Sequence, residues 1–332
     1  MRSKSIKYVL LALAASGFAS LAQAGSIDAI DAFGDSLSDV GNVFLTLGIP
    51  APPYVNGQFS NGNVWVQDLA LDLGLAPLTP SLAGGTDYAV GSAQSGTTLF
   101  NSAGPADLPA QLTLFQTANP GGADPNALYT IWIGSNDLGA IPAGATPAQI
   151  QADGAAIISN IDGAINTLAG LGAKNFLVVT VPDLGKTPDV TALGGLASAA
   201  ASALSAGFDD ALVNGSGPLP SLAGLAAIDG INIATLNSYL LVDSIVADPA
   251  AAGLTNVTDP CLTGAVNFSG GTPCATPDQY LFWDGSHPTA AGHELLADAA
   301  LAVVTPEPAS VLLSGIGLCG LFLLRRRYCG SR

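Results

Sequence analysis

The amino-acid sequence predicts an α/β fold: a three-layer α/β/α sandwich around a mostly parallel central sheet. Short runs rich in apolar and β-branched residues alternate along the chain with longer stretches in which apolar residues recur at helical spacing. Strands that are apolar on both faces are typical of parallel sheets covered by helices on each side. About 280 residues remain once the two chain ends are set aside, enough for one sizeable core, and no linker or long repeat divides them.

Each element follows from its local pattern. The last helix shows the periodicity clearly, because Ala291, Leu295, Ala299 and Val303 recur about one turn apart. Ligands of open α/β sheets bind beyond the carboxyl ends of the strands, and polar motifs directly follow two of the strands. The predicted strands are 27–33, 128–133, 175–181 and 231–236, and the predicted helices are 63–73, 147–171, 193–213 and 289–304.

The first 24 residues are typical of an export signal. A basic stretch that ends at Lys7 is followed by an apolar run at 9–15 and by the cleavage motif Ala22-Gln23-Ala24. We expect the signal, residues 1–24, to be removed, so that the mature chain begins at Gly25. A membrane anchor is the alternative, but the apolar run is short for a span.

Residues 305–332 form a second distinct segment. Pro306-Glu307-Pro308 precedes an apolar run at 309–324, and the arginines 325–327 follow directly. This order resembles the PEP-CTERM sorting tail of bacterial exported proteins. The resemblance implies a transient transmembrane anchor, with its arginines on the cytoplasmic side, and an exosortase-like sorting protease that cuts near the Pro-Glu-Pro. Because the apolar run of 16 residues is shorter than the ~20 of a comfortable span, a buried C-terminal helix is the alternative.

The segment between the two ends is strongly acidic. Residues 25–305 hold 24 of the 25 acidic residues but only two basic ones, Lys174 and Lys186, so their formal charge is −22. Such a charge argues against nucleic acid and against anionic lipid headgroups as partners. Solubility outside the cell explains the same composition equally well.

Cys261 and Cys274 lie in the acidic segment, whereas Cys319 and Cys329 lie in the tail. In an exported chain we expect the first pair to form a disulfide bond, which contributes about 3 kcal/mol of stability by closing a short loop. This bond would brace the segment that leads to Asp284. No Cys-x-x-Cys or His-x-x-x-His spacing is present, so a zinc site is not expected.

Two motifs supply a serine, a histidine and an aspartate. Ser36 lies in Gly34-Asp35-Ser36-Leu37-Ser38 directly after the first predicted strand, and Asp284-Gly285-Ser286-His287-Pro288 lies near the end of the chain. The chain has only two histidines, and His287 has a carboxylate three positions before it. A serine nucleophile needs a base and a carboxylate that orients the base. Taken alone, Ser36 is equally well explained as a helix cap.

Four blocks of sequence stand in a fixed order: Phe33-Gly34-Asp35-Ser36-Leu37-Ser38-Asp39, Tyr88-Ala89-Val90-Gly91, Ile133-Gly134-Ser135-Asn136-Asp137 and Phe282-Trp283-Asp284-Gly285-Ser286-His287-Pro288-Thr289. They resemble the signature blocks of the GDSL lipases and esterases, the SGNH hydrolase family. The resemblance spans nearly all of 25–304, the expected hydrolase domain, and it implies a flavodoxin-like fold. No Gly-x-Ser-x-Gly motif of ordinary α/β-hydrolases occurs.

The resemblance implies a role for each matching residue. Ser36 would be the nucleophile, with His287 as its base and Asp284 as the partner of the base. The oxyanion hole would consist of the Ser36 and Gly91 backbone N–H groups and the Asn136 side chain. We expect Ser36 at a helix N-terminus, where the helix dipole favours negative charge, and we expect Gly91 to let its backbone approach the reacting carbonyl.

Neighbouring residues have structural explanations. After Gly91 the family often has a second glycine, whereas this chain has Ser92. We expect His293 to be a packing or surface residue rather than the base. Asp35 and Asp137 are expected to fix their loops through hydrogen bonds to neighbouring backbone.

The sequence therefore predicts an exported serine hydrolase that cleaves carboxylic esters through an acyl-enzyme, with no metal or organic cofactor. The expected substrate is a small-molecule or lipid ester, and the expected place is the cell envelope or the extracellular space. Because PEP-CTERM proteins are associated with exopolysaccharide, an esterase or acyltransferase acting on acyl groups of an extracellular polysaccharide is the nearest alternative. A non-catalytic surface or matrix protein is a further alternative.

Overall fold

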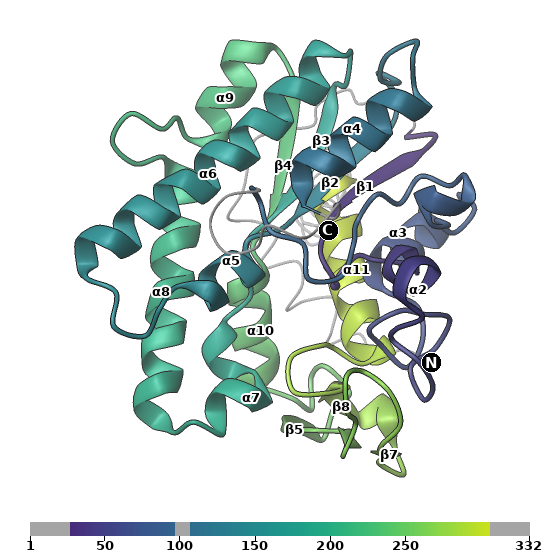
Figure 1. Ribbon diagram of the computed structural model, residues 1–332, viewed down its shortest axis with the longest axis vertical. Coiled ribbons are helices and arrows are strands. Elements are labelled where there is room, and N and C mark those ends of the chain that lie inside the picture. The colour runs from purple at the N-terminus through teal and green to yellow at the C-terminus, as the bar shows by residue number, and fades with distance from the viewer. Residues whose placement is uncertain (1–26, 97–106, 306–332) are drawn as a thin grey trace, which may run out of the picture.

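The computed structural model describes residues 27–96 and 107–305. The predicted export signal and nearly all of the predicted sorting tail lie outside these ranges, and within them no helix is long and apolar enough to cross a membrane. A parallel four-stranded sheet in the order β1-β2-β3-β4 lies between two layers of helices (Figure 1), which confirms the three-layer α/β/α architecture. The strands are β1 Ile30–Gly34, β2 Leu128–Trp132, β3 Asn175–Val179 and β4 Asn232–Leu236.

A short extended segment lies along the free edge of β1. The Ala32 N–H donates to the Thr86 carbonyl at 3.0 Å. Four residues further on, the Val90 N–H donates to the Gly34 carbonyl at 3.2 Å. The segment therefore serves as a rudimentary fifth strand, and it brings Gly91 beside the end of β1.

Successive strand residues face opposite sides of the sheet and divide the core into two parts. In β1, Ala32 packs with the helices of one face and Phe33 with those of the other. Every residue of β1, β2 and β3 is buried, which is why these strands read as continuous apolar runs. The first face is covered by α3 Trp65–Asp72, α10 Ser238–Ala247 and α11 Ala290–Val304, and the second by α4 Leu108–Ala118, α6 Pro147–Gly170, α8 Gly195–Asn214 and α9 Leu222–Asp229.

The four predicted helices correspond to α3, α6, α8 and α11, with ends within about two residues of the predicted ones. The start of α6 is fixed by a capping box, in which Thr146 and Gln149 each bind the backbone of the other. The shortest helices are not predicted, since a few residues cannot show helical periodicity. They are α2 Asn42–Leu47, α5 Ser135–Ala140 and α7 Pro188–Thr191, with the 3-10 turns η1 Ser81–Ala83, η2 Leu184–Lys186 and η3 Pro277–Gln279.

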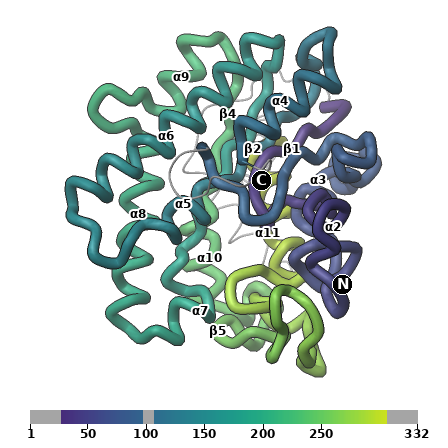
Figure 2. Tube along the Cα trace, viewed as in Figure 1, coloured from purple at the N-terminus to yellow at the C-terminus, as the bar shows by residue number. Residues whose placement is uncertain are grey.

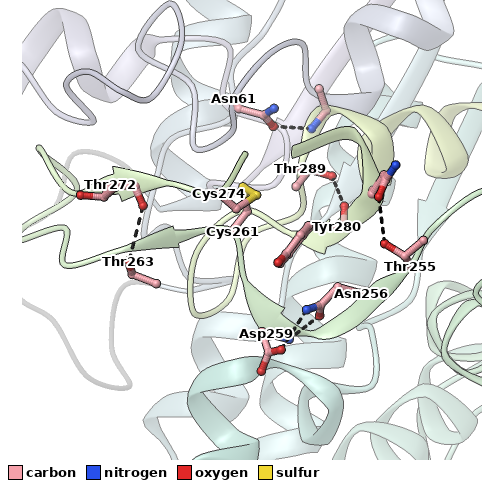
Figure 3. The surroundings of a disulfide bond; sticks show 12 residues. Asn61, Thr255, Asn256, Asp259, Cys261, Thr263, Thr272, Cys274, Tyr280 and Thr289 are labelled. Carbon is pink, nitrogen blue, oxygen red and sulfur yellow. Dashed lines mark hydrogen bonds between the residues drawn. A yellow bond between two sulfur atoms is a disulfide. The ribbon is translucent and has the colours of Figure 1, made fainter. Parts of the chain in front are cut away.

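A small region outside the main sheet precedes Asp284. Cys261 and Cys274 form a disulfide bond with a Cα–Cα distance of 4.8 Å (Figure 3). The loop that the bond closes holds an antiparallel pair of short strands, and the Cys261 N–H donates to the Phe282 carbonyl at 3.0 Å. The disulfide-bonded loop is therefore joined directly to the strand that leads to Asp284. The strands of this region are β5 Asn256–Pro260, β6 Leu262–Thr263, β7 Thr272–Pro273 and β8 Tyr280–Phe282.

Two segments far apart in the sequence meet beside the sheet. Figure 2 shows the purple start of the described chain next to its yellow-green end. The Ser60 hydroxyl donates to the Pro288 carbonyl at 3.1 Å, and the Ala290 N–H donates to the Asn61 side chain at 2.8 Å. This junction ties the loop after α2 to the start of α11.

Candidate active site

Ser36 lies in the turn that follows β1. A Cβ atom on Gly34 would lie 2.3 Å from the Trp132 carbonyl oxygen, so the close approach to β2 requires glycine. The Gln111 side chain holds the Gly34 backbone with two hydrogen bonds, of 3.0 and 2.7 Å. The Asp35 carbonyl closes the turn around Ser36 by accepting the N–H groups three and four residues further on, both at 3.0 Å.

The expectation that Ser36 stands at a helix N-terminus is wrong. Residues 36–38 form a turn, and α2 begins only at Asn42. The buried Asp39 carboxylate accepts the N–H groups of Gly41, Asn42 and Val43 at 2.6–3.1 Å. Asp39 therefore satisfies the free donors at the start of α2, and that helix end faces a carboxylate instead of Ser36.

The second motif folds into a tight turn that presents His287. Asp284 Oδ1 accepts the backbone N–H groups of Ser286 at 2.9 Å and of His287 at 2.8 Å. The His287 Nδ1 atom lies 2.9 and 2.8 Å from the two oxygens of the same carboxylate. The three-residue spacing therefore lets Asp284 orient both the backbone and the ring of His287.

Ser36 and His287 meet beside the junction of the two chain segments. Ser36 Oγ lies 2.9 Å from His287 Nε2, although 251 positions separate them in the sequence. Ser36, Asp284 and His287 are exposed by only 9%, 8% and 6%. The three side chains form an uninterrupted series of hydrogen bonds, in the order that activation of a hydroxyl by a general base requires.

The charges in this series stabilise one another. Burial raises the pKa of Asp284, but the His287 charge and hydrogen bonds outweigh burial, and the pKa falls to about 2. Burial lowers the pKa of His287, but the Asp284 charge and hydrogen bond outweigh it, so the pKa lies above the usual 6.5. Asp284 is therefore ionised at neutral pH, and it stabilises the imidazolium form of His287.

Tyr54 belongs to the site, although it lies outside the sequence motifs. The buried Tyr54 hydroxyl donates to Asp284 Oδ2 at 2.7 Å. Burial and the adjacent Asp284 carboxylate raise the pKa of Tyr54, so the hydroxyl remains a donor. Because 230 positions separate the two residues, no local pattern in the sequence signals the pair.

Two phenylalanine rings enclose the His287 imidazole. Phe59 stacks on it with ring centroids 5.0 Å apart and an interplanar angle of 29°. Phe268 meets it edge-on, with a centroid distance of 5.8 Å and an angle of 74°. Phe268 belongs to the disulfide-bonded loop, and its carbonyl accepts the Ala51 N–H at 2.9 Å. These contacts restrict rotation of the imidazole and shield it from water.

Asn136 reaches the site from the end of β2. Gly134, with a φ of 119°, turns the chain into α5, and Asn136 is the second residue of that helix. The Asn136 Nδ2 atom donates to the Ala93 carbonyl at 2.9 Å and lies 3.4 Å from Asp35 Oδ2. One amide hydrogen is therefore fixed, and the other makes only a long contact with the residue that precedes Ser36.

Gly91 lies at the site, but its N–H is engaged. This N–H donates to Asp39 Oδ2 at 2.8 Å and is not free for a substrate. Packing explains the glycine, since a Cβ at position 91 would lie 2.5 Å from the Phe59 ring. The backbone N–H groups of Ser36 and Ser92 donate to no acceptor among the residues that the structure describes. Ser92 adopts a left-handed φ of 66°, a conformation in which glycine is more usual.

His293, Asp35 and Asp137 have structural roles. His293 is fully buried, and its Nδ1 atom accepts the Trp65 N–H at 3.3 Å, which confirms it as a packing residue. Burial lowers the pKa of His293 to about 3, so this imidazole stays neutral. Asp35 accepts a backbone N–H of its own turn at 3.0 Å, and Asp137 accepts the Ser95 N–H at 3.0 Å. Both aspartates therefore fix loops, as predicted.

The fold and the site together define a class of protein. A serine, a histidine and an aspartate in hydrogen-bonded series, beyond the carboxyl ends of parallel strands in an α/β/α fold, form the arrangement of a serine hydrolase. The model of the GDSL-like Lipase/Acylhydrolase family matches residues 30–300. The chain therefore belongs to the GDSL-like lipase/acylhydrolase family, which confirms the resemblance seen in its four blocks.

Relatives from bacteria and plants show the same similarity. The thermolabile hemolysin of Vibrio parahaemolyticus is 27% identical over 84% of this chain, which spans only 64% of that relative. A GDSL esterase/lipase of Arabidopsis thaliana is 27% identical over 82% of this chain and 88% of its own length. The phosphatidylcholine-sterol acyltransferase of Aeromonas hydrophila is 26% identical over 84% of this chain and 80% of its own length.

Solved structures include an α/β hydrolase from the metagenome of Lake Arreo, Spain. It is 14% identical to this chain, with a TM-score of 0.43 over 84% of this chain and 99% of its own. A putative GDSL-like lipase from Parabacteroides merdae is 11% identical, with a TM-score of 0.42 over 84% and 96% of the two chains.

Proposed function

We propose that the protein is a serine esterase or lipase that hydrolyses carboxylic esters through an acyl-enzyme on Ser36. The main support is the 2.9 Å contact between Ser36 Oγ and His287 Nε2, with the Asp284 carboxylate bound to Nδ1 on the other side of the imidazole. The carboxylate keeps Nδ1 protonated, which leaves the Nε2 lone pair facing the hydroxyl. Membership of a lipase/acylhydrolase family supports the same reaction.

The proposed reaction has two halves. His287 Nε2 takes the Ser36 proton while Oγ attacks the ester carbonyl carbon, and His287 then gives this proton to the departing alcohol. In the second half, His287 takes a proton from water, the hydroxide attacks the acyl-enzyme, and the proton returns to Ser36 as the acid leaves. The raised pKa of His287 supports the imidazolium that forms in both halves.

We assign the oxyanion hole to the Ser36 N–H, the Asn136 side-chain amide and the Ser92 N–H. Ser92 replaces its neighbour Gly91, whose N–H is bound to Asp39. A donor aimed at the developing oxyanion contributes on the order of 3 kcal/mol in the transition state. The Asn136→Ala variant is therefore expected to lose about 100-fold or more in kcat, with a much smaller change in KM.

Export to the cell envelope or the extracellular space is part of the proposal. Its support is the signal-like segment 1–24, the charge of −22 over 25–305 and the disulfide bond, which is typical of oxidising compartments. The tail 305–332 would hold the protein in the membrane until a sorting protease cuts it. Mass spectrometry of protein recovered from growing cells tests this. An N-terminus at Gly25 supports export, and an uncut chain confined to the cytoplasm contradicts it.

Transfer of the acyl group to an alcohol is the second candidate. A relative named phosphatidylcholine-sterol acyltransferase, which aligns with 84% of this chain, favours it. Hydrolysis and transfer share the acyl-enzyme and differ only in the attacking group. Product analysis in the presence of a sterol distinguishes the two, since a transferase yields the sterol ester and a hydrolase yields only the free acid. An acetylated polysaccharide tests the polymer alternative in the same assay.

A panel of nitrophenyl esters of increasing acyl length tests the proposed hydrolysis. Ser36→Ala and His287→Ala are expected to lose at least about 1,000-fold in kcat/KM. Ser216→Ala is the matched control, because Ser216 is exposed, and it should keep wild-type activity. A fluorophosphonate probe should label the wild type and the control but not Ser36→Ala. Ester hydrolysis by Ser36→Ala at the wild-type rate would refute the mechanism.

A further inference from the structure

Two segments of the chain that include α2 and η1 have no charged side chains. Residues 40–67 and 73–86 contain no Asp, Glu, Lys, Arg or His, although 25–305 holds 24 acidic residues. Within these stretches the Asn42 side chain ties α2 to η1, because its Oδ1 atom accepts the Leu82 N–H at 3.1 Å. Helix α2 and turn η1 therefore lie side by side, and neither of them carries a charged side chain.

Four large apolar side chains are exposed on α2 and η1. Phe44 is exposed by 40%, Leu45 by 53%, Leu47 by 68% and Leu82 by 47%, and we call these four the α2 patch. Single exposed apolar side chains are common on protein surfaces, although their burial is favourable. Here four of them lie on the six-residue helix α2 and the adjacent turn η1, and they therefore form a group. Such groups of exposed apolar side chains are typical of surfaces that bind a protein partner or a membrane.

The α2 patch lies next to the proposed reaction centre. Val43, the buried neighbour of Phe44, and Phe59 both pack at Gly91, where an added Cβ would lie 3.2 Å from Val43 and 2.5 Å from Phe59. The Phe59 ring in turn stacks on His287. Val43 of α2 and the ring that stacks on His287 therefore meet at Gly91, so α2 lies close to the imidazole.

We propose that the α2 patch docks the protein on a lipid surface whose headgroups have no net charge, and that esters of this surface are its substrates. This proposal rests on the proposed esterase function. Apolar side chains enter the boundary between headgroups and acyl chains most easily when no charged group must be dehydrated with them.

Charge selects the kind of lipid. Anionic headgroups are recognised by Lys and Arg, and both are absent from the two uncharged stretches. Lys174 and Lys186 are the only basic residues of 25–305, and the charge of −22 repels an anionic surface. Zwitterionic headgroups, such as phosphocholine, carry no such penalty. We therefore expect the protein to dock on phosphatidylcholine-like surfaces and not on phosphatidylglycerol-like ones.

The test compares two double variants of the full chain, so that the tail is the same in both. Leu45→Ser with Leu47→Ser changes the α2 patch, and Leu193→Ser with Leu196→Ser is the control, because these leucines are exposed by 76% and 92% but lie outside the patch. Binding is measured by flotation with vesicles of phosphatidylcholine or of phosphatidylglycerol. Activity is measured on a soluble monomeric ester and on an ester held in micelles.

The patch variant is expected to bind phosphatidylcholine vesicles at least about tenfold more weakly and to lose activity on micelles by a similar factor. Its kcat/KM on the monomeric ester should stay at the wild-type value, as should every property of the control. Equal vesicle binding by the patch variant, stronger binding to phosphatidylglycerol, or a wild-type dimer that the patch variant abolishes would each overturn the proposal. If no ester is hydrolysed but the patch governs vesicle binding, the esterase function fails and the docking surface stands.

Discussion

The Tyr54→Phe substitution isolates one hydrogen bond of the proposed catalytic series. Phenylalanine keeps the ring contacts of Tyr54 with Trp283 and Phe268, whose centroids lie 6.1 and 6.2 Å away, and removes only the hydroxyl that donates to Asp284 at 2.7 Å. A buried hydrogen bond to a charged group contributes about 1.5–3 kcal/mol. We therefore expect the free energy of unfolding to fall by about that amount.

The same change moves the pH profile in a defined direction. The hydroxyl stabilises the charged form of Asp284, so its removal raises the pKa of that carboxyl above its present value of about 2. A more basic carboxylate holds the imidazolium of His287 more strongly and raises the pKa of His287 further. The base must be neutral to act, so the acidic limb of kcat/KM should shift to higher pH. If the whole 1.5 kcal/mol of the hydrogen bond appeared as a change in the pKa of His287, the acidic limb would move by about one pH unit.

The assay is kcat/KM for a soluble ester from pH 4 to 10, combined with urea unfolding at pH 7. Tyr129→Phe is the matched control: Tyr129 is also buried, but its hydroxyl donates at 3.0 Å to the Asp124 carbonyl, away from the site. The control is expected to lose stability without any shift of the acidic limb. A Tyr54→Phe variant that is less stable but has an unmoved acidic limb refutes the inference that the Tyr54 hydroxyl acts on the pKa of His287 through Asp284.

Three further predictions concern residues around the site. Gly91→Ala should cost about 1–3 kcal/mol of stability and lower kcat/KM, since its Cβ would meet the Phe59 ring; an unchanged melting temperature contradicts this. Because the pKa of His293 is about 3, the unfolded chain binds its proton first, and stability should fall by up to about 1.4 kcal/mol per pH unit below pH 6.5; in urea unfolding, His293→Gln should lack this slope. Cys274→Ser should cost about 3 kcal/mol of stability and also lower kcat/KM, because Phe268 of the same loop contacts the His287 imidazole; full activity at a reduced melting temperature would contradict this link between the loop and the site.

The sequence predicts the strands of the main sheet and the longest helices, α6, α8 and α11, because their signals are local, but it misses α4 and α10, which have 11 and 10 residues. Strands β1, β2 and β3 are buried on both faces and therefore largely apolar along their length, and α6 and α11 are long enough for their periodicity to be read. Helix α9, Leu222–Asp229, is not predicted, since it is apolar on nearly every side and offers no contrast between its faces. The edge segment beside β1 is too short and irregular to show a strand pattern.

The site was predictable where chemistry restricts the residue type. Only two histidines are available, and the spacing of Asp284 and His287 is compatible with a single turn, so this pair stands out in the sequence. The partners that only the tertiary structure brings together did not stand out in the sequence. Tyr54 lies 230 positions from Asp284, to which it donates, and Asp39 lies 52 positions from Gly91, whose N–H it accepts. The helix expected at Ser36 is replaced by a turn that the Asp35 carbonyl closes, and α2 begins only at Asn42, where the Asp39 carboxylate accepts the first N–H groups.

The separation of 251 positions between Ser36 and His287 has a consequence for the life of the chain. Synthesis, and export as proposed here, deliver the N-terminal part first. The serine is therefore present without its base until nearly the whole domain has emerged, and fragments that stop before position 284 hold no functional pair. On the proposed mechanism, folding of the complete chain is therefore also the step that assembles the reactive pair.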